Sequence, residues 1–314
     1  MSTQLADLRA VWRMRVFEEK VRELRLAGDA VGSIHLGIGQ EAIAVGAAGL
    51  IGPEDALFAT YRGHSWALSC GVPPESLFAE ILGRATGING GRGGSAHLNA
   101  PGYRFFGENS IVGAGAPIAV GAALAGRFDG SNRVALTVFG DGAMNQGAVH
   151  EALNFAAAMS LPVVFLCENN TWSELTPIAE MVRDPELYKR AAGYGIPGER
   201  IDGNDPAVVR ERLTDAFEMA REGGGPTLLE AMTARLVGHY IGDAEAYRRP
   251  GELDEARRRE PVARLSEQLR ATGVDEDTIQ GAERAARDEM ELAADAALAA
   301  PLADPTTARD HLYV

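Results

Sequence analysis

The segment 134–172 constrains the fold of this chain most, because it reads as a complete strand–helix–strand unit. A β-rich apolar run ends in a Gly-Asp-Gly turn at 140–142, a helical stretch follows, and a second apolar run ends in Glu-Asn-Asn at 168–170. Such a unit joins two parallel strands through a crossover helix. We therefore predict an α/β fold, with a parallel sheet, helices on both faces and ligand-binding side chains at the carboxyl ends of the strands.

Two polar residues at those strand ends indicate a cation site. Asp141 offers a carboxylate on a glycine-flanked turn, where backbone can approach a ligand closely. Asn170 adds an amide oxygen after the next strand, and with a backbone carbonyl the set suits Mg²⁺, which shares phosphate oxygens with a bound molecule. The amide groups after Asp141 can hold phosphate at a helix start. From spacing alone, an ordinary buried unit with a turn Asp remains the alternative.

Composition excludes several classes of function. The chain has 314 residues, of which 46% are hydrophobic and 24% charged, a mix typical of a globular protein. A net charge of −14 argues against non-specific binding to nucleic acid or to an anionic membrane. The two cysteines, Cys70 and Cys167, indicate neither a disulfide framework nor a zinc site. The charged N-terminus lacks a signal-peptide core, and no run approaches the roughly 18 apolar residues of a membrane helix, so we expect a cytoplasmic protein.

The chain divides by pattern into a central part and two helical ends. Apolar residues recur at helical spacing over 4–27, and Gly28 ends that run. Beyond about Glu245 the chain is highly charged and then rich in Ala and Glu with a helical pattern. We predict an N-terminal helical segment, a binding domain of α/β type and a helical C-terminal extension, at residues 1–32, 33–245 and 246–314 respectively.

Two further stretches place cationic and aromatic groups after apolar runs. Tyr61, Arg62 and His64 follow one run, and Arg235 and His239 follow a predicted strand. Arginine is a strong phosphate ligand because its planar fork matches phosphate oxygens, whereas a surface role remains the alternative for each residue taken alone.

Glycine is concentrated in the stretch 87–98. No Gly-Lys-Ser/Thr follows, so this is not a Walker loop, and we interpret it as a mobile loop over the site. His97 within it has a structural role as its simpler interpretation. His35 and Gln40, from an earlier glycine-containing stretch, are candidates for the entrance to the site, with a structural role equally open.

The interval between Gly-Asp-Gly and Asn-Asn is that of the thiamine-diphosphate/Mg²⁺ motif. Residues of about 33–248 resemble the alpha subunit of the thiamine-diphosphate-dependent first component of 2-oxo acid dehydrogenase complexes, in the pyruvate and acetoin dehydrogenase branches. The resemblance also rests on Gly-Gln-Glu-Ala at 39–42, Tyr-Arg-Gly-His at 61–64 and Arg-Leu-Val-Gly-His at 235–239. It implies a thiamine-diphosphate-binding fold of the pyrophosphate type.

The resemblance also implies cofactors and the residues that hold them. Thiamine diphosphate and Mg²⁺ are the expected cofactors, and the Mg²⁺ ligands are Asp141, Asn170 and the backbone carbonyl of Trp172. His64 and His239 are the expected catalytic residues. The residues expected to contact thiamine diphosphate are Tyr61, Arg62, Ser110, Val112, Gly140, Gly142, Ala143, Asn170, Arg235 and His239.

One of these positions departs from the family pattern. Ser110 stands where the family usually has a glycine, whose backbone and that of the residue at Val112 hold the aminopyrimidine of the cofactor. A backbone with positive φ at this position would strain a serine.

The implied activity is that of a thiamine-diphosphate-dependent 2-oxo acid or acetoin dehydrogenase, which passes an acyl group to a lipoyl carrier on a dihydrolipoyl acyltransferase. In the resembled enzymes a separate beta subunit supplies the Glu that activates the cofactor, so we expect an α₂β₂ heterotetramer. A stand-alone lyase or carboligase is one alternative, with Glu41 or Glu108 as its internal Glu. A non-catalytic cofactor-binding subunit is the other.

Overall fold

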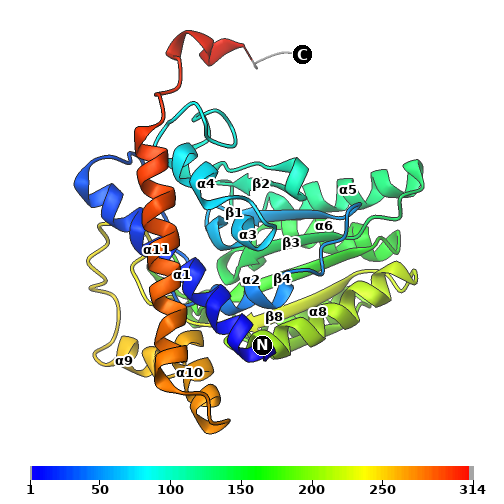
Figure 1. Ribbon diagram of the computed structural model, residues 1–314. Coiled ribbons are helices and arrows are strands. Elements are labelled where there is room, and N and C mark those ends of the chain that lie inside the picture. The colour runs from blue at the N-terminus through cyan, green and yellow to red at the C-terminus, as the bar shows by residue number, and fades with distance from the viewer. Residues whose placement is uncertain (1, 311–314) are drawn as a thin grey trace.

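Figure 1 shows the computed structural model of the protein, which describes residues 2–310. Its centre is a six-stranded sheet in which every neighbouring pair of strands is parallel. This confirms the predicted α/β fold. The strand order is β2 (Phe105–Asn109), β1 (Ala56–Thr60), β3 (Ala135–Gly140), β4 (Val163–Asn169), β8 (Thr227–Met232) and β7 (Gly198–Asp202).

The central strands are apolar on both faces, because helices cover both. In β3, Leu136 and Val138 point into one hydrophobic core, and Ala135 and Phe139 point into another. Alternation of side chains along a strand produces this division. The near-continuous apolar runs that predicted these strands are therefore typical of a parallel sheet buried on both sides.

The helices form a layer on each face of the sheet (Figure 1). One layer contains α5 (Gly115–Asp129) and α6 (Gly147–Ala158), which share a core with one face of β3. The core on the other face includes residues of four helices within the predicted central part. These are α2 (Glu41–Ala47), α3 (His64–Ser69), α4 (Pro74–Ile81) and α8 (Pro206–Arg221).

Two long helices from opposite ends of the sequence pack side by side next to the sheet, α1 (Thr3–Ala27) and α11 (Glu276–Ala299) (Figure 1). Ser2 caps α1 by accepting a hydrogen bond from the amide of Leu5, and Gly28 ends it in the left-handed conformation, as predicted. Two further C-terminal helices are α9 (Glu252–Arg257) and α10 (Pro261–Ala271).

A buried ion-pair cluster ties both ends of the chain to the central part. Arg15 of α1 binds the carboxylate of Glu41 at the start of α2 and that of Glu260 before α10, the latter at 2.7 Å. Each carboxylate is buried, so the single guanidinium offsets two charges that would be costly if unpaired.

The remaining elements are short. A hairpin of β5 (Trp172–Ser173) and β6 (Thr176–Pro177) follows β4, and α7 (Ile178–Met181) follows the hairpin. None of the helices within residues 2–310 has both the length and the apolar character needed to cross a membrane.

Candidate active site

A cavity of about 330 Å³ lies over the carboxyl ends of β1, β3 and β4. Ligands bind at this edge in open parallel sheets, where the strand order reverses direction. All site residues expected from the sequence line this cavity except His64: Tyr61, Arg62, Ser110, Val112, Gly140, Asp141, Gly142, Ala143, Asn170, Trp172, Arg235 and His239.

Asp141 leaves one carboxylate oxygen without a partner. Its side chain is 1% exposed, and Oδ2 is buried with no hydrogen bond among the described residues. Burial raises the pKa of this carboxyl to about 6. A cation bound at the cavity would satisfy the free oxygen and offset the cost of burying the charge.

The two glycines beside Asp141 differ in the space around them. A Cβ on Gly142 would lie 2.1 Å from Ser173 Oγ of the hairpin, so only glycine fits there. A Cβ on Gly140 would meet nothing within 4 Å, so this part of the backbone is open to the cavity. The turn therefore presents bare backbone where a ligand can approach it.

Asn169, which ends β4, and Asn170, which follows it, diverge because successive side chains of a strand point to opposite sides. Asn169 turns to Glu230, with 2.6 Å between its Nδ2 and Oε1 of the carboxylate. Asn170 lines the cavity; its Nδ2 donates to Gln40 Oε1 at 2.9 Å, and its Oδ1 accepts from the amide of Trp172 at 3.0 Å. The bond to Gln40 fixes the amide orientation and keeps the oxygen on the side of Trp172.

One carboxylate, one amide and one backbone carbonyl fit a magnesium ion that takes its other ligands from a diphosphate and water. Within residues 2–310 no group of three or more His, Cys, Asp or Glu side chains is arranged to hold a metal by itself. A magnesium site of the expected kind needs only one such residue, Asp141.

Two buried guanidinium groups face the same cavity without a carboxylate partner. Arg62 donates to the carbonyls of Leu36 and His239, at 2.6 and 3.2 Å. Arg235, which is 1% exposed, donates to the carbonyls of Val237 and Glu174. Neither forms an ion pair within the described chain, whose other buried arginine, Arg15, has two.

Burial lowers the pKa of both guanidinium groups, that of Arg62 to about 10, and the positive charge of Arg235 lowers that of Arg62 further. Two positive charges held together in a cavity wall repel each other, and a bound anion would offset that repulsion. A diphosphate is a suitable anion, because its oxygens match the planar donors of arginine.

His239 bonds to both arginines through one ring nitrogen. Its Nδ1 lies 3.5 Å from Arg62 Nη2 and 3.4 Å from Arg235 Nη1, and both arginine atoms are donors. Nδ1 must therefore accept, and the proton of a neutral ring lies on Nε2. Burial and Arg62 lower the pKa of His239 to about 3, so the ring is neutral at physiological pH.

A second histidine, His35, packs against His239 with ring centres 4.9 Å apart and against Tyr61 at 4.5 Å. Burial lowers the pKa of His35 to about 4, and its Nδ1 is buried without a hydrogen-bond partner in the part of the chain that the structure describes. His35 and Gln40, which we expected at the entrance, both line the cavity.

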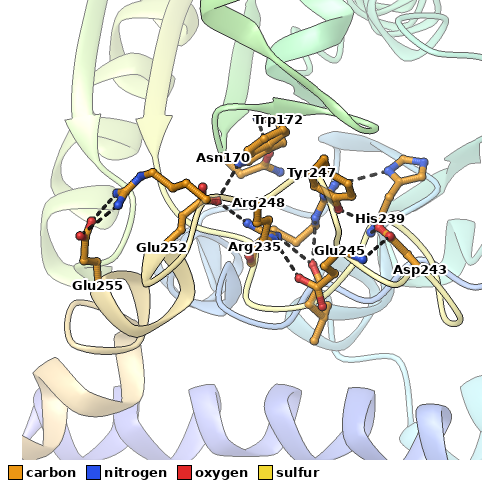
Figure 2. A network of polar contacts seen from close by, with 12 residues as sticks. Asn170, Trp172, Arg235, His239, Asp243, Glu245, Tyr247, Arg248, Glu252 and Glu255 are labelled. Carbon is orange, nitrogen blue, oxygen red and sulfur yellow. Dashed lines mark hydrogen bonds and ion pairs between the residues drawn. The ribbon is translucent and has the colours of Figure 1, made fainter.

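The segment after β8 is held in place by a polar network (Figure 2). Tyr247 accepts from Arg235 at 2.9 Å and donates to Asp243 at 2.7 Å, while Asp243 accepts the amide proton of His239 at 2.6 Å. Arg248 donates to the carbonyl of Arg235 at 2.9 Å. The network fixes both Arg235 and His239 relative to the cavity.

His64, expected to face the reacting centre, is placed elsewhere. It begins α3, is 0% exposed and does not line the cavity. Its Nδ1 lies 2.8 Å from Glu18 Oε2 of α1, and its Nε2 lies 2.9 Å from Ser95 Oγ of the glycine-rich stretch. The sequence placed His64 near the site but did not indicate that its ring bonds to Glu18 and Ser95.

Ser110 lines the cavity without the strain that we considered. The described non-glycine residues with positive φ are Arg104, Asn132, Ser160, Thr171, Glu174 and Glu245, and Ser110 is not among them. Serine therefore fits its backbone conformation as well as glycine does. Its Oγ lies 3.4 Å from His97 Nε2.

Glu168 is the main cavity residue that the sequence reasoning left without a role. It accepts from Trp66 Nε1 at 3.1 Å, and burial raises the pKa of its carboxyl to about 7. Its place directly before the two asparagines, at the end of an apolar strand, was the available signal. Thr60, Ser173 and Glu174 also line the cavity and were not predicted.

The two glutamates considered for a stand-alone enzyme both lie away from the cavity wall. Glu41 is 0% exposed and bound to Arg15. Glu108 is 8% exposed, and neither of its oxygens forms a well-placed hydrogen bond within residues 2–310. Burial, followed by the charge of Glu18, raises the pKa of Glu108 well above its usual value.

We expect Glu108→Gln to increase thermal stability, more at pH 8 than at pH 5. Between the unfolded pKa of 4.5 and the higher folded pKa, the folded state binds one more proton than the unfolded state. The free energy of unfolding then falls by about 1.4 kcal/mol for each pH unit across that window. Glutamine removes this loss, which thermal denaturation at the two pH values measures. Exposed Glu54→Gln is the control, and an equal pH dependence of wild type and Glu108→Gln would contradict the prediction.

The parallel sheet carries, over its strand ends, a buried carboxylate with a free oxygen and two arginines without a carboxylate partner in the described chain. This arrangement is typical of α/β enzymes that bind a phosphate-bearing cofactor. Comparison with known sequences narrows this class. The family described as "Dehydrogenase E1 component" matches residues 9–306 of the chain.

Alpha subunits from several bacteria are similar in sequence to this chain. The alpha subunits of acetoin:2,6-dichlorophenolindophenol oxidoreductase from Bacillus subtilis and Cupriavidus necator are each 41% identical to this chain. The first match covers 79% of this chain and 76% of the relative, and the second covers 84% and 79%. The pyruvate dehydrogenase E1 component subunit alpha of Zymomonas mobilis is 38% identical, over 94% of this chain and 84% of the relative.

The chain belongs to the dehydrogenase E1 component family, in its alpha-subunit branch. The family is thiamine-diphosphate-dependent and its members are oxidoreductases. The resemblance seen in the sequence motifs is thereby confirmed.

Proposed function

We propose that this chain is the alpha subunit of a thiamine-diphosphate-dependent dehydrogenase that decarboxylates a 2-oxo acid or cleaves acetoin, and that passes the acyl group to a lipoyl carrier. The arrangement of charge in the cavity supports this most directly. Asp141 presents a free carboxylate oxygen, and Arg62 and Arg235 present positive charge with no carboxylate partner in the described chain. A magnesium diphosphate supplies the cation and the anion together.

In this proposal Asp141, Asn170 and the Trp172 carbonyl hold Mg²⁺. Arg62 and Arg235, with Tyr61 beside them, neutralise the diphosphate, and the open backbone at 140–143 adds amide donors. Thiamine diphosphate, when bound, supplies the electron sink for the bond that is broken. The names of the relatives support acetoin and pyruvate as the substrates to test first.

His239 is the proposed hydrogen-bond donor at the cavity wall. Its Nδ1 is occupied by two arginines, which leaves Nε2–H free to donate to a substrate or acyl acceptor. Burial and the charge of Arg62 lower the pKa of His239 to about 3, so the ring is neutral and donates this hydrogen bond without giving up its proton. His64 is buried and does not line the cavity, so we assign it to support of the site rather than to contact with substrate.

A beta subunit completes the proposed enzyme as an α₂β₂ heterotetramer. Several large apolar side chains of α5, α6 and the segment before them are exposed, including Ile111 at 70% and Phe128 at 83%. The two helices pack together in one outer layer of the molecule (Figure 1). Exposed apolar side chains on one layer are typical of a surface that another subunit covers.

We expect the purified chain alone to be inactive when thiamine diphosphate and Mg²⁺ are supplied. Neither Glu41 nor Glu108 reaches the cavity. Glu168 lines it but accepts a hydrogen bond from Trp66 Nε1, so we propose that a partner supplies the carboxyl group that activates the cofactor. Reduction of an electron-accepting dye is the measurement, with pyruvate, acetoin and branched 2-oxo acids compared. Activity of the isolated chain would contradict the need for a beta subunit.

The same assay on the chain co-purified with its partner tests the function itself. Dye reduction with one of the substrates, lost in a complex that carries Asp141→Asn, is the expected result. Cofactor binding without reduction of the dye by any substrate would favour a non-catalytic subunit or a lyase.

A further inference from the structure

The glycine-rich stretch 87–98 is wound around a single carboxylate. Glu80, near the end of α4, is 0% exposed and forms no ion pair within the described residues. Its Oε2 accepts the amide protons of Asn89 and Gly91 at 2.7 and 2.8 Å, and its Oε1 accepts that of Gly93 at 2.5 Å. Three backbone donors therefore converge on one carboxylate and form a nest around it.

The glycines of this stretch are explained by that winding. A Cβ on Gly87 would lie 2.3 Å from Glu80 Oε2. Gly91 has a φ of 76°, and a Cβ there would lie 2.7 Å from the carbonyl oxygen of Arg84. Glycine at these positions therefore permits a defined conformation, in which the backbone passes close to the carboxylate and to α4.

The C-terminal segment beyond α11 holds the same stretch from outside. The amide of Ala85 donates to the carbonyl of Pro301 at 2.8 Å, and Arg92 Nη2 donates to Thr307 Oγ1 at 2.7 Å. Figure 1 shows this last segment passing beside the loop that follows α4. The stretch is thus held between a buried carboxylate and a second piece of chain.

The far end of the stretch contacts one residue of the cavity wall. Ser95 Oγ lies 2.9 Å from His64 Nε2, and His64 in turn bonds to Glu18. His97 Nε2 lies 3.4 Å from the hydroxyl of Ser110, which lines the cavity. The position of this end therefore depends on the conformation that Glu80 imposes a few residues earlier.

We propose that Glu80 is a positioning residue for the reaction: its carboxylate winds the stretch 87–98 into the shape that sets Ser95 and His97 beside the cofactor cavity. The functional part of this inference rests on the function proposed above. Glu80 touches neither cavity nor ligand, and it acts only through the backbone that it binds. Loss of its charge should therefore loosen the stretch and reduce turnover while the sheet and its helices remain folded.

Glu80→Gln tests the proposal in the complex of this chain with its partner subunit. The amide keeps the size of the carboxylate but turns acceptor positions into donors that face backbone N–H groups. Trypsin cleavage after Arg92 is the first measurement, followed by the mass of the fragment that ends there. We expect cleavage about tenfold faster or more than in wild type, since local opening exposes that bond. Glu75→Gln, exposed on the same helix, should match wild type.

Turnover is the second measurement, because a merely structural role would not change it in a folded complex. With an unchanged midpoint of thermal unfolding, Glu80→Gln should lower kcat or raise the KM for thiamine diphosphate by about tenfold. Wild-type cleavage after Arg92 would overturn the proposal, and so would a loosened stretch with unchanged kcat and KM. If the wild-type complex shows no activity with any substrate, the proposed function fails, whereas the cleavage result still decides whether Glu80 holds the stretch.

Gly91→Ala decides the matter if Glu80→Gln does not fold. The added methyl group strains a left-handed residue and meets the backbone of Arg84, so it opposes the winding without altering the carboxylate. We expect the same faster cleavage after Arg92. Cleavage of Gly91→Ala at the wild-type rate would overturn the proposal.

Discussion

Asp141→Asn should abolish binding of Mg²⁺ and thiamine diphosphate while it increases the stability of the cofactor-free protein. The carboxylate is buried and one of its oxygens has no partner in the described chain, so its charge costs stability until a cation binds. We expect cofactor affinity to fall by about 100-fold or more, and the free energy of unfolding without cofactor to rise by about 1 kcal/mol. Calorimetric titration and thermal denaturation measure the two effects.

The opposite signs of the two effects are the diagnostic feature. Asp29→Asn removes an exposed carboxylate and should change neither quantity. If Asp141→Asn bound cofactor as wild type does, or if it lowered the stability of the cofactor-free protein, Asp141 would not be the cation ligand that we propose.

Arg62→Met should lower the affinity for thiamine diphosphate by about 100-fold, and Arg62→Lys should have an intermediate effect. Methionine removes the charge, whereas lysine keeps it but loses the planar fork that matches phosphate. Inorganic pyrophosphate provides a readout free of catalysis, because it should raise the midpoint of thermal unfolding of wild type and not that of Arg62→Met.

A control variant that loses one positive charge elsewhere tests whether the effect depends on Arg62 itself or only on the net charge. Arg258→Met removes an exposed arginine and should leave the stabilisation by pyrophosphate intact. If pyrophosphate stabilised wild type and Arg62→Met equally, the anion would not bind at Arg62.

Much of the fold was predictable because local signals agreed with burial. The pattern over 206–221 gives α8 with the same bounds, since Asp205 caps it, a proline begins it and glycines follow it. Strand β4, the second strand of the strand–helix–strand unit at 134–172, extends beyond the apolar run that predicted it. Glu168 and Asn169 extend β4 because each finds a specific partner, Trp66 and Glu230 respectively.

The sequence predicted which residues form the site, but it did not predict where all of their side chains point. Strand ends meet at one edge of a parallel sheet, so Asp141, Asn170 and Arg235 were bound to converge. The direction of His64 depends on Glu18, which lies on a helix remote in sequence. The winding of the glycine-rich stretch depends on Glu80, and irregular backbone around a carboxylate has no period that a sequence pattern could reveal.

The pairing of α1 with α11 has a consequence for the order in which the protein can be completed during synthesis. The helix made among the first residues presents Val11, Phe17 and Val21 to a core that includes a helix made near the end. Until the later helix emerges from the ribosome, this part of the core is incomplete, and contacts of such long sequence separation form slowly. Since Glu18 on the same early helix bonds to His64, we expect the position of His64 to settle only once nearly the whole chain has been translated.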